Sequence, residues 1–180
     1  DAFAQDAVKF SRALTPTPAS AMAYSSTLSG VPSRVTPSYV HVHGVDAPVP
    51  DDFPLASVLA ASGRQTMGVT AFFKSTQLRP EFVSMGRGFE RFNSDGHIKP
   101  LDAREVTDRV VALLAQRRAR DPFFIFAHYL DPHAPYQFKS GHDFGARPVD
   151  AYDSEIAFAD SEIGRLLDKL EELGLSDQTI

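Results

Sequence analysis

The spacing of hydrophobic residues predicts that helices and strands alternate along the chain. Residues 53–62 place apolar side chains at helical spacing, and Gly63 follows where such a helix would end. Residues 66–73 form an apolar run that predicts a buried strand. A capping-box pattern at Asp102 and Glu105 precedes another helical segment. The apolar positions of that segment are Val106, Val110, Leu113 and Leu114.

The same alternation continues to the end of the chain. Residues 123–127 are apolar at every position, which is expected of a strand covered on both faces. The last helix is predicted over residues 152–173 and ends before Gly174. Its predicted inward-facing residues are Ile156, Ile163, Leu166, Leu167 and Leu170. Strands alternating with helices predict a layered α/β sheet.

The first part of the chain allows two interpretations. Residues 14–38 contain four prolines, which exclude a continuous helix through the whole stretch. Residues 19–28 lack Pro and Gly and predict a short helix that ends at Gly30, whereas the composition also suits a low-complexity linker. Residues 39–43 alternate bulky side chains and predict a short strand.

Composition excludes several classes of protein. The chain has 180 residues, 43% of them hydrophobic and 23% charged, so it suits one domain with a core. The absence of Cys excludes disulfides, thiolate zinc sites and cysteine nucleophiles. A net charge of −5 argues against nucleic acid as the main partner. The longest apolar stretch, residues 123–130, is too short to span a membrane.

The strongest chemical signal is the segment HYLDPHAPY at residues 128–136, where the chain leaves the apolar strand. Pro132 and Pro135 restrict the backbone on either side of His133, which lowers the entropic cost of aiming its ring. A histidine held there can donate a hydrogen bond to an anionic oxygen or protonate a leaving group. The alternative is a surface turn whose histidines bond only to the backbone.

Two further patterns offer candidate chemistry. The first is a group of hydroxyl residues before Gly30: Ser20, Ser25, Ser26, Thr27 and Ser29. A serine at the start of a helix lies among N–H groups that stabilise an alkoxide, and a metal ion would be its natural activator; these hydroxyls suit helix caps equally well. The second pattern is His41 and His43, which would share a strand face and could hold a metal or have a structural role.

Several segments occur in a fixed order along the chain: VKFSRALTPTP, SSTLSG, HGV, LASVLAASGRQTMGV, GRGFERF, FFIFAHYLDPHAPY and YDSEIAFADSEIGRLLDKLEELGLSDQTI. Together they resemble the sulfatase branch of the alkaline phosphatase superfamily. The most specific segment, residues 123–136, is similar to the hydrophobic strand and D-P-H-x-P-Y loop of that family. The resemblance covers nearly all 180 residues.

The resemblance implies a fold and a set of site residues. The implied fold is a three-layer α/β/α sandwich around a mixed, mostly parallel sheet, of which residues 1–180 form part of a single catalytic domain that is incomplete at both ends. Ser20, ten residues before Gly30, matches the nucleophile position. His133 matches the histidine that contacts the anionic group of the ester, and Asp131 and Tyr136 are expected to bind substrate beside it.

The resemblance also implies a divalent metal. Calcium is expected for a sulfatase, and Mn²⁺ or Zn²⁺ for a phosphatase-like member. Ser20 would contact this metal through the nucleophile, whereas the main Asp and His ligands are expected outside this chain. We therefore expect an excerpt that is catalytically incompetent alone.

The chain departs from the sulfatase pattern at two positions. Met22 stands where the C/S-x-P-x-R motif has proline, and Tyr24 stands where it has arginine. The G-K-W-H-L-G segment of many arylsulfatases is also absent. The departures at Met22 and Tyr24 argue against conversion of Ser20 to formylglycine, and the missing segment removes its Lys and His from the expected sulfate contacts. They favour either an unmodified serine alkoxide or a loss of activity.

The predicted function is a metal-dependent hydrolase of sulfate esters that works through a covalent intermediate on a Ser20-derived nucleophile. The first alternative is a phosphomonoester or phosphodiester hydrolase or phosphotransferase of the same superfamily. The second is an inactive homologue that binds anions or glycans, and the third is a metal hydrolase centred on His41 and His43. The expected partner is a small-molecule or glycan ester, and the resemblance alone suggests a periplasmic or extracellular location.

Overall fold

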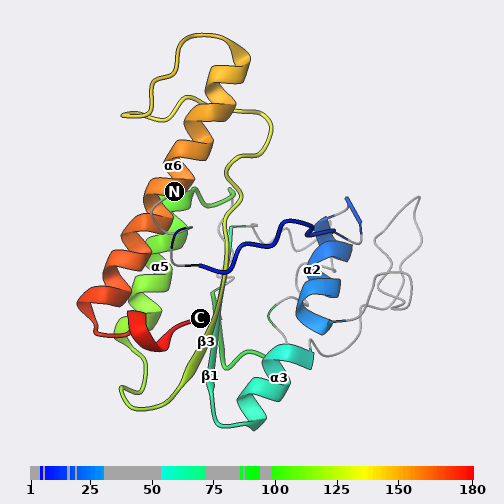
Figure 1. Cartoon of the computed structure of the whole chain (residues 1–180), viewed down its shortest axis with the longest axis vertical. Helices are drawn as coiled ribbons and strands as arrows, with labels where there is room; N and C mark the ends of the chain where they lie inside the picture. The colour runs from blue at the N-terminus through cyan, green and yellow to red at the C-terminus, as the bar shows by residue number, and fades with distance from the viewer. Residues whose placement is uncertain are drawn as a thin grey trace.

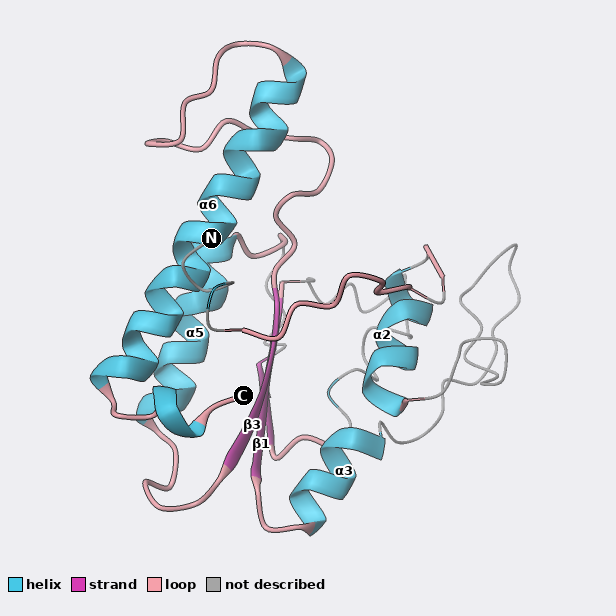
Figure 2. Cartoon of the chain, viewed as in Figure 1, coloured by secondary structure: helices cyan, strands magenta, loops and turns pink. Residues whose placement is uncertain are grey.

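The computed structural model describes residues 5, 7–15, 17–18, 20–30, 54–71, 86, 88–93 and 99–180. Within these residues helices and strands follow one another in the predicted order (Figure 2). The elements are α2 (Ser20–Ser29), α3 (Pro54–Ala61), β1 (Gln65–Thr70), β2 (Arg91–Asn93), α5 (Ala103–Ala115), β3 (Phe123–His128), α6 (Pro148–Glu172) and a 3₁₀ turn, η2 (Ser176–Gln178).

The three described strands form a parallel sheet in the order β2-β1-β3. Gln65 lies opposite Phe123 at one end of the β1–β3 pair, and Thr70 lies opposite His128 at the other. Helices α2 and α3 lie on one side of this sheet, and α5 and α6 lie on the other (Figure 1). The predicted α/β/α layering is therefore confirmed for the described elements.

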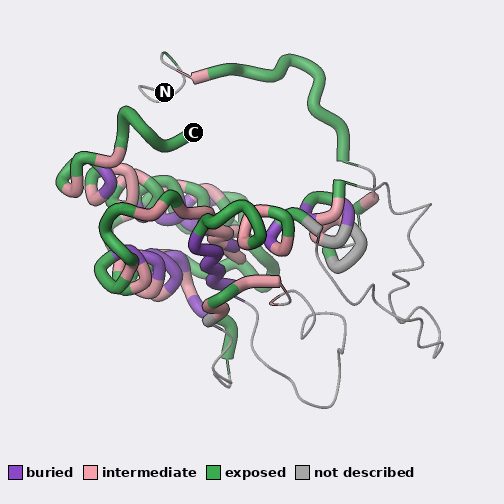
Figure 3. The backbone as a smooth tube through the Cα atoms, turned by 90° about the horizontal axis from the view of Figure 1, so that it is seen from below, coloured by how far each residue is buried: buried purple, intermediate pink, exposed green. Residues whose placement is uncertain are grey.

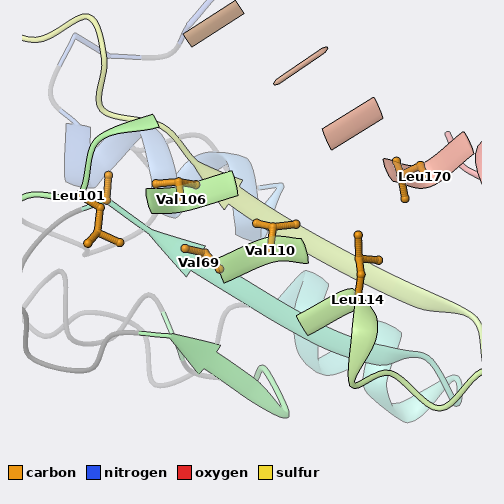
Figure 4. Packing of buried hydrophobic residues seen from close by; sticks show 7 residues of the cluster. Val69, Leu101, Val106, Val110, Leu114 and Leu170 are labelled. Atoms are coloured by element: carbon orange, nitrogen blue, oxygen red, sulfur yellow. The ribbon is translucent and has the colours of Figure 1, made fainter. Parts of the chain in front are cut away.

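The main core lies between the sheet and the α5–α6 layer. β1 is buried at all six positions, and one side of α5 is buried as well (Figure 3). Figure 4 shows the side chains that meet there. The buried cluster consists of Val69, Ala71, Leu101, Val106, Val110, Leu114 and Leu170. Burial of this apolar surface, at roughly 25 cal/mol per Å², fixes α5 and α6 against the sheet.

A smaller aromatic cluster covers the opposite face of the sheet. Leu28 of α2 is fully buried there, and Tyr24, Phe89, Phe92 and Phe126 pack around it. Gly68 makes this packing possible, because a Cβ at that position would lie 2.4 Å from a ring carbon of Phe92. This cluster is what attaches α2 to the sheet.

The structure confirms the short helix after the prolines, since α2 ends at Ser29 and Gly30 follows with φ of 70°. It corrects the predicted start of the last helix, because α6 begins at Pro148 rather than at residue 152. It also places Ile156 and Ile163 about 40% exposed, so neither faces inward as predicted. Strand β2 was not predicted, and the strand expected over residues 39–43 lies outside the described residues.

The two exposed isoleucines have a physical explanation. Up to Glu162, the inward face of α6 carries buried polar residues, among them Ser154, Glu155 and Glu162, which bond to neighbouring segments. The predicted apolar pattern therefore holds only in the last turns of the helix, where Leu166 and Leu167 pack against the core. None of the described helices is long and apolar enough to cross a membrane.

Helix α5 begins with the predicted capping box. The Asp102 carboxylate accepts a hydrogen bond from the Glu105 N–H at 2.9 Å, and the Glu105 carboxylate accepts one from the Asp102 N–H at 2.9 Å. These bonds satisfy two donors that a helix start otherwise leaves without an acceptor.

The substitution Asp102→Ala should lower the free energy of unfolding by about 1 kcal/mol, because the Glu105 N–H loses its acceptor. Urea unfolding followed by circular dichroism measures this change. Asp160→Ala, on the exposed surface of α6, is the matched control and should change stability by less than about 0.5 kcal/mol. Equal stability of the two variants would contradict this role of the capping box.

Candidate functional site

The candidate site lies at the carboxyl end of the parallel sheet. β1 ends at Thr70 and β3 ends at His128, and the two strands end at the same edge because they run parallel. Helix α2 begins at this end of the molecule, and the segment that leads from β3 to α6 leaves from it (Figure 1). The topology thus brings the start of α2 and the D-P-H loop to one edge of the sheet.

Ser20 is the first residue of α2, and it is exposed. The other hydroxyl residues that the sequence grouped with it are distributed along the helix, with Ser26 buried and Ser29 at the last position. Of this group only Ser20 lies in the first turn, where backbone N–H groups have no acceptor within the helix. The helix dipole also favours an anion at this position.

His128 occupies the last position of β3 and is 7% exposed. Its Nδ1 shares a hydrogen bond of 3.1 Å with the Thr70 hydroxyl, and its ring lies edge-on to Tyr24 with 4.8 Å between centroids. Burial, and then the charge of His133, lower the pKa of His128 from 6.5 to about 4. The imidazole is therefore neutral near pH 7.

Asp131 and Lys139 form a buried ion pair that closes the first part of the loop. The Lys139 Nζ lies 2.6 Å from Asp131 Oδ1, and their side chains are 17% and 7% exposed. The same ammonium lies 5.0 Å from the centroid of the Phe158 ring of α6. The Asp131 carboxylate thus already has a cationic partner within the chain.

Helix α6 fixes the backbone of the loop through two buried polar side chains. The Glu155 carboxylate accepts hydrogen bonds from the His133 N–H at 3.2 Å and the Gln137 N–H at 3.1 Å. The Ser154 hydroxyl accepts one from the Lys139 N–H at 2.7 Å. These three bonds tie residues 133–139 to α6.

His133 is exposed on this anchored backbone. Its Nδ1 lies 2.7 Å from the Ala134 carbonyl oxygen. Because a carbonyl can only accept, Nδ1 must donate in this bond, so Nε2 carries the lone pair of the neutral ring. Nε2 is therefore the atom of His133 that can take up a proton or, once protonated, donate to an anion.

Tyr136 lies three residues further along the loop and is 46% exposed. Its ring makes an edge contact with Tyr152 of α6 at a centroid separation of 5.1 Å. The contact leaves part of the Tyr136 ring on the surface. Its predicted role in substrate binding stays a prediction.

A cavity of about 320 Å³ lies between the loop and the start of α5. The loop contributes Asp131, His133 and Lys139 to its walls, α5 contributes Asp102 and Glu105, and α6 contributes Glu155. Of the predicted substrate-binding residues, the cavity therefore brings Asp131 and His133 together. Ser20 and Tyr136 are not part of its lining.

Within the described part of the chain, no three His, Asp or Glu side chains converge as metal ligands. The expectation that the main metal ligands lie outside this chain stays a prediction. His41 and His43 lie outside the described residues.

The chain matches the model of a known protein family. The family model described as Sulfatase matches residues 1–180. The chain belongs to the sulfatase family. The family resemblance inferred from the D-P-H loop and its flanking segments is thereby confirmed.

Solved structures show the same fold at low sequence identity. The sulfatase-family chain superposes on Ps i-CgsB in complex with k-i-k-neocarrahexaose with a TM-score of 0.66 and 16% identity, over 89% of its own length and 46% of that chain. A protein in the alkaline phosphatase superfamily from Vibrio parahaemolyticus gives 0.58 and 15%, over 84% and 39%. The lipoteichoic acid synthase LtaP from Listeria monocytogenes gives 0.51 and 16%, over 66% and 32%.

The chain spans less than half the length of each of these three structures. A search of curated protein sequences gave no match. At 15–16% identity the structural likeness establishes the fold of the sulfatase-family chain.

The substitution Glu155→Ala should destabilise the folded chain by about 3 kcal/mol, because two loop N–H groups and Lys139 lose a buried acceptor. Glu155→Gln keeps an acceptor oxygen and should cost about 1 kcal/mol. Thermal unfolding measures the stabilities, and amide hydrogen exchange at His133 and Gln137 reports the loop. Glu171→Ala, at the exposed end of α6, is the control. Unchanged exchange at both amides in Glu155→Ala would refute the anchoring role.

The stability of the fold should fall with pH between about 6.5 and 4 because of His128. The unfolded chain binds a proton at His128 near pH 6.5, whereas the folded chain resists protonation until the pH reaches about 4. Within this interval the unfolded state holds more protons, so the free energy of unfolding falls by up to about 3 kcal/mol as the pH is lowered.

Urea unfolding at several pH values measures this dependence. The variant His128→Asn should have a shallower slope between pH 6.5 and 4 than the wild type. His142→Asn, which removes a histidine from the loop beyond the D-P-H segment, should keep the wild-type slope. A slope that is unchanged in His128→Asn would contradict the assignment.

Proposed function

We propose that the full protein is a hydrolase of sulfate esters in which Ser20 supplies the nucleophile and His133 assists it. The observation that carries this proposal is the common location of the two residues' elements. Helix α2 begins, and the His133 loop leaves β3, at the carboxyl end of the same parallel sheet. Crevices at the carboxyl ends of the strands are where open α/β sheets bind ligands.

The first step would be attack of the Ser20 oxygen on the sulfur of the ester. The Ser20 hydroxyl gives up its proton to solvent, a new O–S bond forms, the bond to the alcohol oxygen breaks, and the sulfate half-ester remains on Ser20. The departing alkoxide takes a proton, and protonated His133 can supply one from Nε2 because its Nδ1–H is already bonded to Ala134. Water then hydrolyses the half-ester, releases sulfate and regenerates the hydroxyl.

Two features of α2 would favour this chemistry. Ser20 lies in the first turn of α2, so backbone N–H groups can stabilise negative charge on its oxygen and on the sulfuryl group. The aromatic cluster around Leu28 fixes the helix on the sheet, which limits the motion of its first residue. The proposed nucleophile is therefore carried by an element with defined placement.

A phosphate ester is the second candidate substrate, and Tyr24 favours it. In the sulfatase motif an arginine stands at this position, but here the Tyr24 ring packs against His128 and Phe126. The chain thus lacks the arginine of the formylglycine motif. An unmodified serine alkoxide, as in the phosphatase and phosphotransferase relatives that the resemblance implies, suits phosphoryl transfer.

We also propose that a divalent metal serves the full protein, calcium for sulfate esters and Mn²⁺ or Zn²⁺ for phosphate esters. Its main ligands would come from parts of the protein outside the described residues, because no cluster of three suitable ligands exists among those described. When bound, such a metal supplies positive charge that lowers the pKa of a nucleophile and polarises an ester oxygen.

The substitutions Ser20→Ala and His133→Ala in the full-length protein test the proposal. Each should lower kcat by at least about 100-fold, because each removes a group that acts on the reacting atoms, while thermal unfolding stays close to that of the wild type. The assay uses 4-nitrophenyl sulfate, 4-nitrophenyl phosphate and bis(4-nitrophenyl) phosphate, each with Ca²⁺, Mn²⁺ or Zn²⁺.

The outcomes of this assay separate the alternatives. Turnover of the sulfate ester alone supports the sulfatase, and preferential turnover of a phosphate ester supports the second candidate. Wild-type protein that turns over none of the three esters would instead support an inactive homologue that binds anions or glycans. Wild-type rates in both variants would remove Ser20 and His133 from the mechanism.

A further inference from the structure

We propose that His128 is a positioning residue: it holds the start of α2 at a fixed distance from the loop that carries His133. This inference rests on the proposed function, because it concerns the geometry between the two residues assigned above. His128 itself is buried and does not reach a substrate at the surface. Its contacts join the sheet to the helix that begins with Ser20.

The first set of contacts fixes His128 to β1. The backbone carbonyl of His128 accepts a hydrogen bond from the Ala71 N–H at 3.1 Å, just beyond the paired ends of the strands. The ring Nδ1 shares a hydrogen bond of 3.1 Å with the hydroxyl of Thr70, its register partner. Backbone and ring are therefore both bonded to neighbouring residues of one strand, which leaves the imidazole with little rotational freedom.

The second set of contacts joins this ring to α2. Tyr24 meets the His128 ring edge-on at 4.8 Å and the Phe126 ring edge-on at 6.2 Å. Phe126 lies two residues before His128 in β3, so both rings are on the same face of the sheet. Tyr24 thus rests on a surface made of two alternate residues of one strand.

The contact of Tyr24 with the sheet influences the position of Ser20, because both residues belong to α2. The two residues are four apart, so they lie on the same face of the helix, about 6 Å apart along its axis. Displacement of Tyr24 by removal of the ring beneath it would therefore shift Ser20. His133 lies five residues after His128, on the loop that leaves β3.

A shift of Ser20 relative to His133 should lower the rate of the proposed reaction. A displacement of about 1 Å between reacting groups can lower the rate about 100-fold. Burial of His128 for structural reasons alone would explain a loss of stability on its substitution but not a loss confined to the chemical step. The distinction is testable, because a positioning role changes kcat at full folding whereas a structural role changes the folded fraction.

The variants separate the two sets of contacts. His128→Leu keeps an apolar side chain beneath Tyr24 but loses the bond to Thr70, and Thr70→Val removes the same bond from the other side. Tyr24→Leu removes the ring that reaches α2. His128→Asn retains an amide that can bond to Thr70, and His142→Leu removes a histidine of the loop that has no part in the proposed site.

The experiment measures kcat and KM of the folded full-length protein, at a temperature well below the unfolding midpoint of each variant. We expect His128→Leu and Tyr24→Leu to lower kcat about 10- to 100-fold with a change in KM of less than about threefold. His128→Asn should recover most of the lost rate, and His142→Leu should match the wild type. Equal kcat in His128→Leu and His142→Leu overturns the inference, even if the wild type is active and the proposed function therefore stands.

If the wild type turns over no ester, a second measurement tests the role of His128. Isothermal titration calorimetry with inorganic sulfate and inorganic phosphate, with the same metals present, reports the anion site without turnover. His128→Leu should weaken binding about tenfold relative to the wild type and to His142→Leu. Equal affinities in all three proteins, or no binding by the wild type, overturn the inference.

Discussion

The parallel pairing of β1 with β3 is the constraint on which the rest of this structure depends. Parallel neighbours cannot be joined by a hairpin, so the chain must cross the sheet between them, and α5 lies in that crossover. The two strands then end at the same edge, with Thr70 opposite His128. The segments that follow these two strands therefore begin at the same end of the sheet. The start of α2 and the His133 loop share this location because of the topology.

Placement at one end of the sheet does not by itself orient the loop of nineteen residues, 129–147, between β3 and α6. The buried polar face at the start of α6 supplies that orientation. Glu155 and Ser154 accept hydrogen bonds from the loop backbone, and Lys139 pairs with Asp131 while its ammonium lies over Phe158. Buried charges are tolerated here because each has a partner. The early start of α6 has a local cause: Pro148 occupies the first helical position, and the Asp150 carboxylate accepts a hydrogen bond from the Arg147 N–H at 2.8 Å.

The sequence predicted most of the fold because its elements have strong local signals. The helix stops at Gly30, Gly63 and Gly174 are confirmed by positive φ angles, and the capping box of α5 is present as predicted. Strand β2 was missed because it is only three residues long and has no alternating pattern. Ile156 and Ile163 were assigned inward by spacing alone. The partners of the polar residues on that face come from the preceding loop and from α5, and local spacing contains no information about them.

For the candidate site, the sequence determined residue types and their order: a serine at a helix start, and a histidine between two prolines after an apolar strand. It also determined the family, because the D-P-H loop and its flanking segments occur together. Only the tertiary structure revealed that His128 is a neutral ring buried between β1, β3 and α2, and that the Asp131 carboxylate is held by Lys139. The physical reason is that burial and charge pairing depend on which distant segments meet. The parallel strands and the helices that connect them determine which segments come into contact. No short stretch of sequence contains that information.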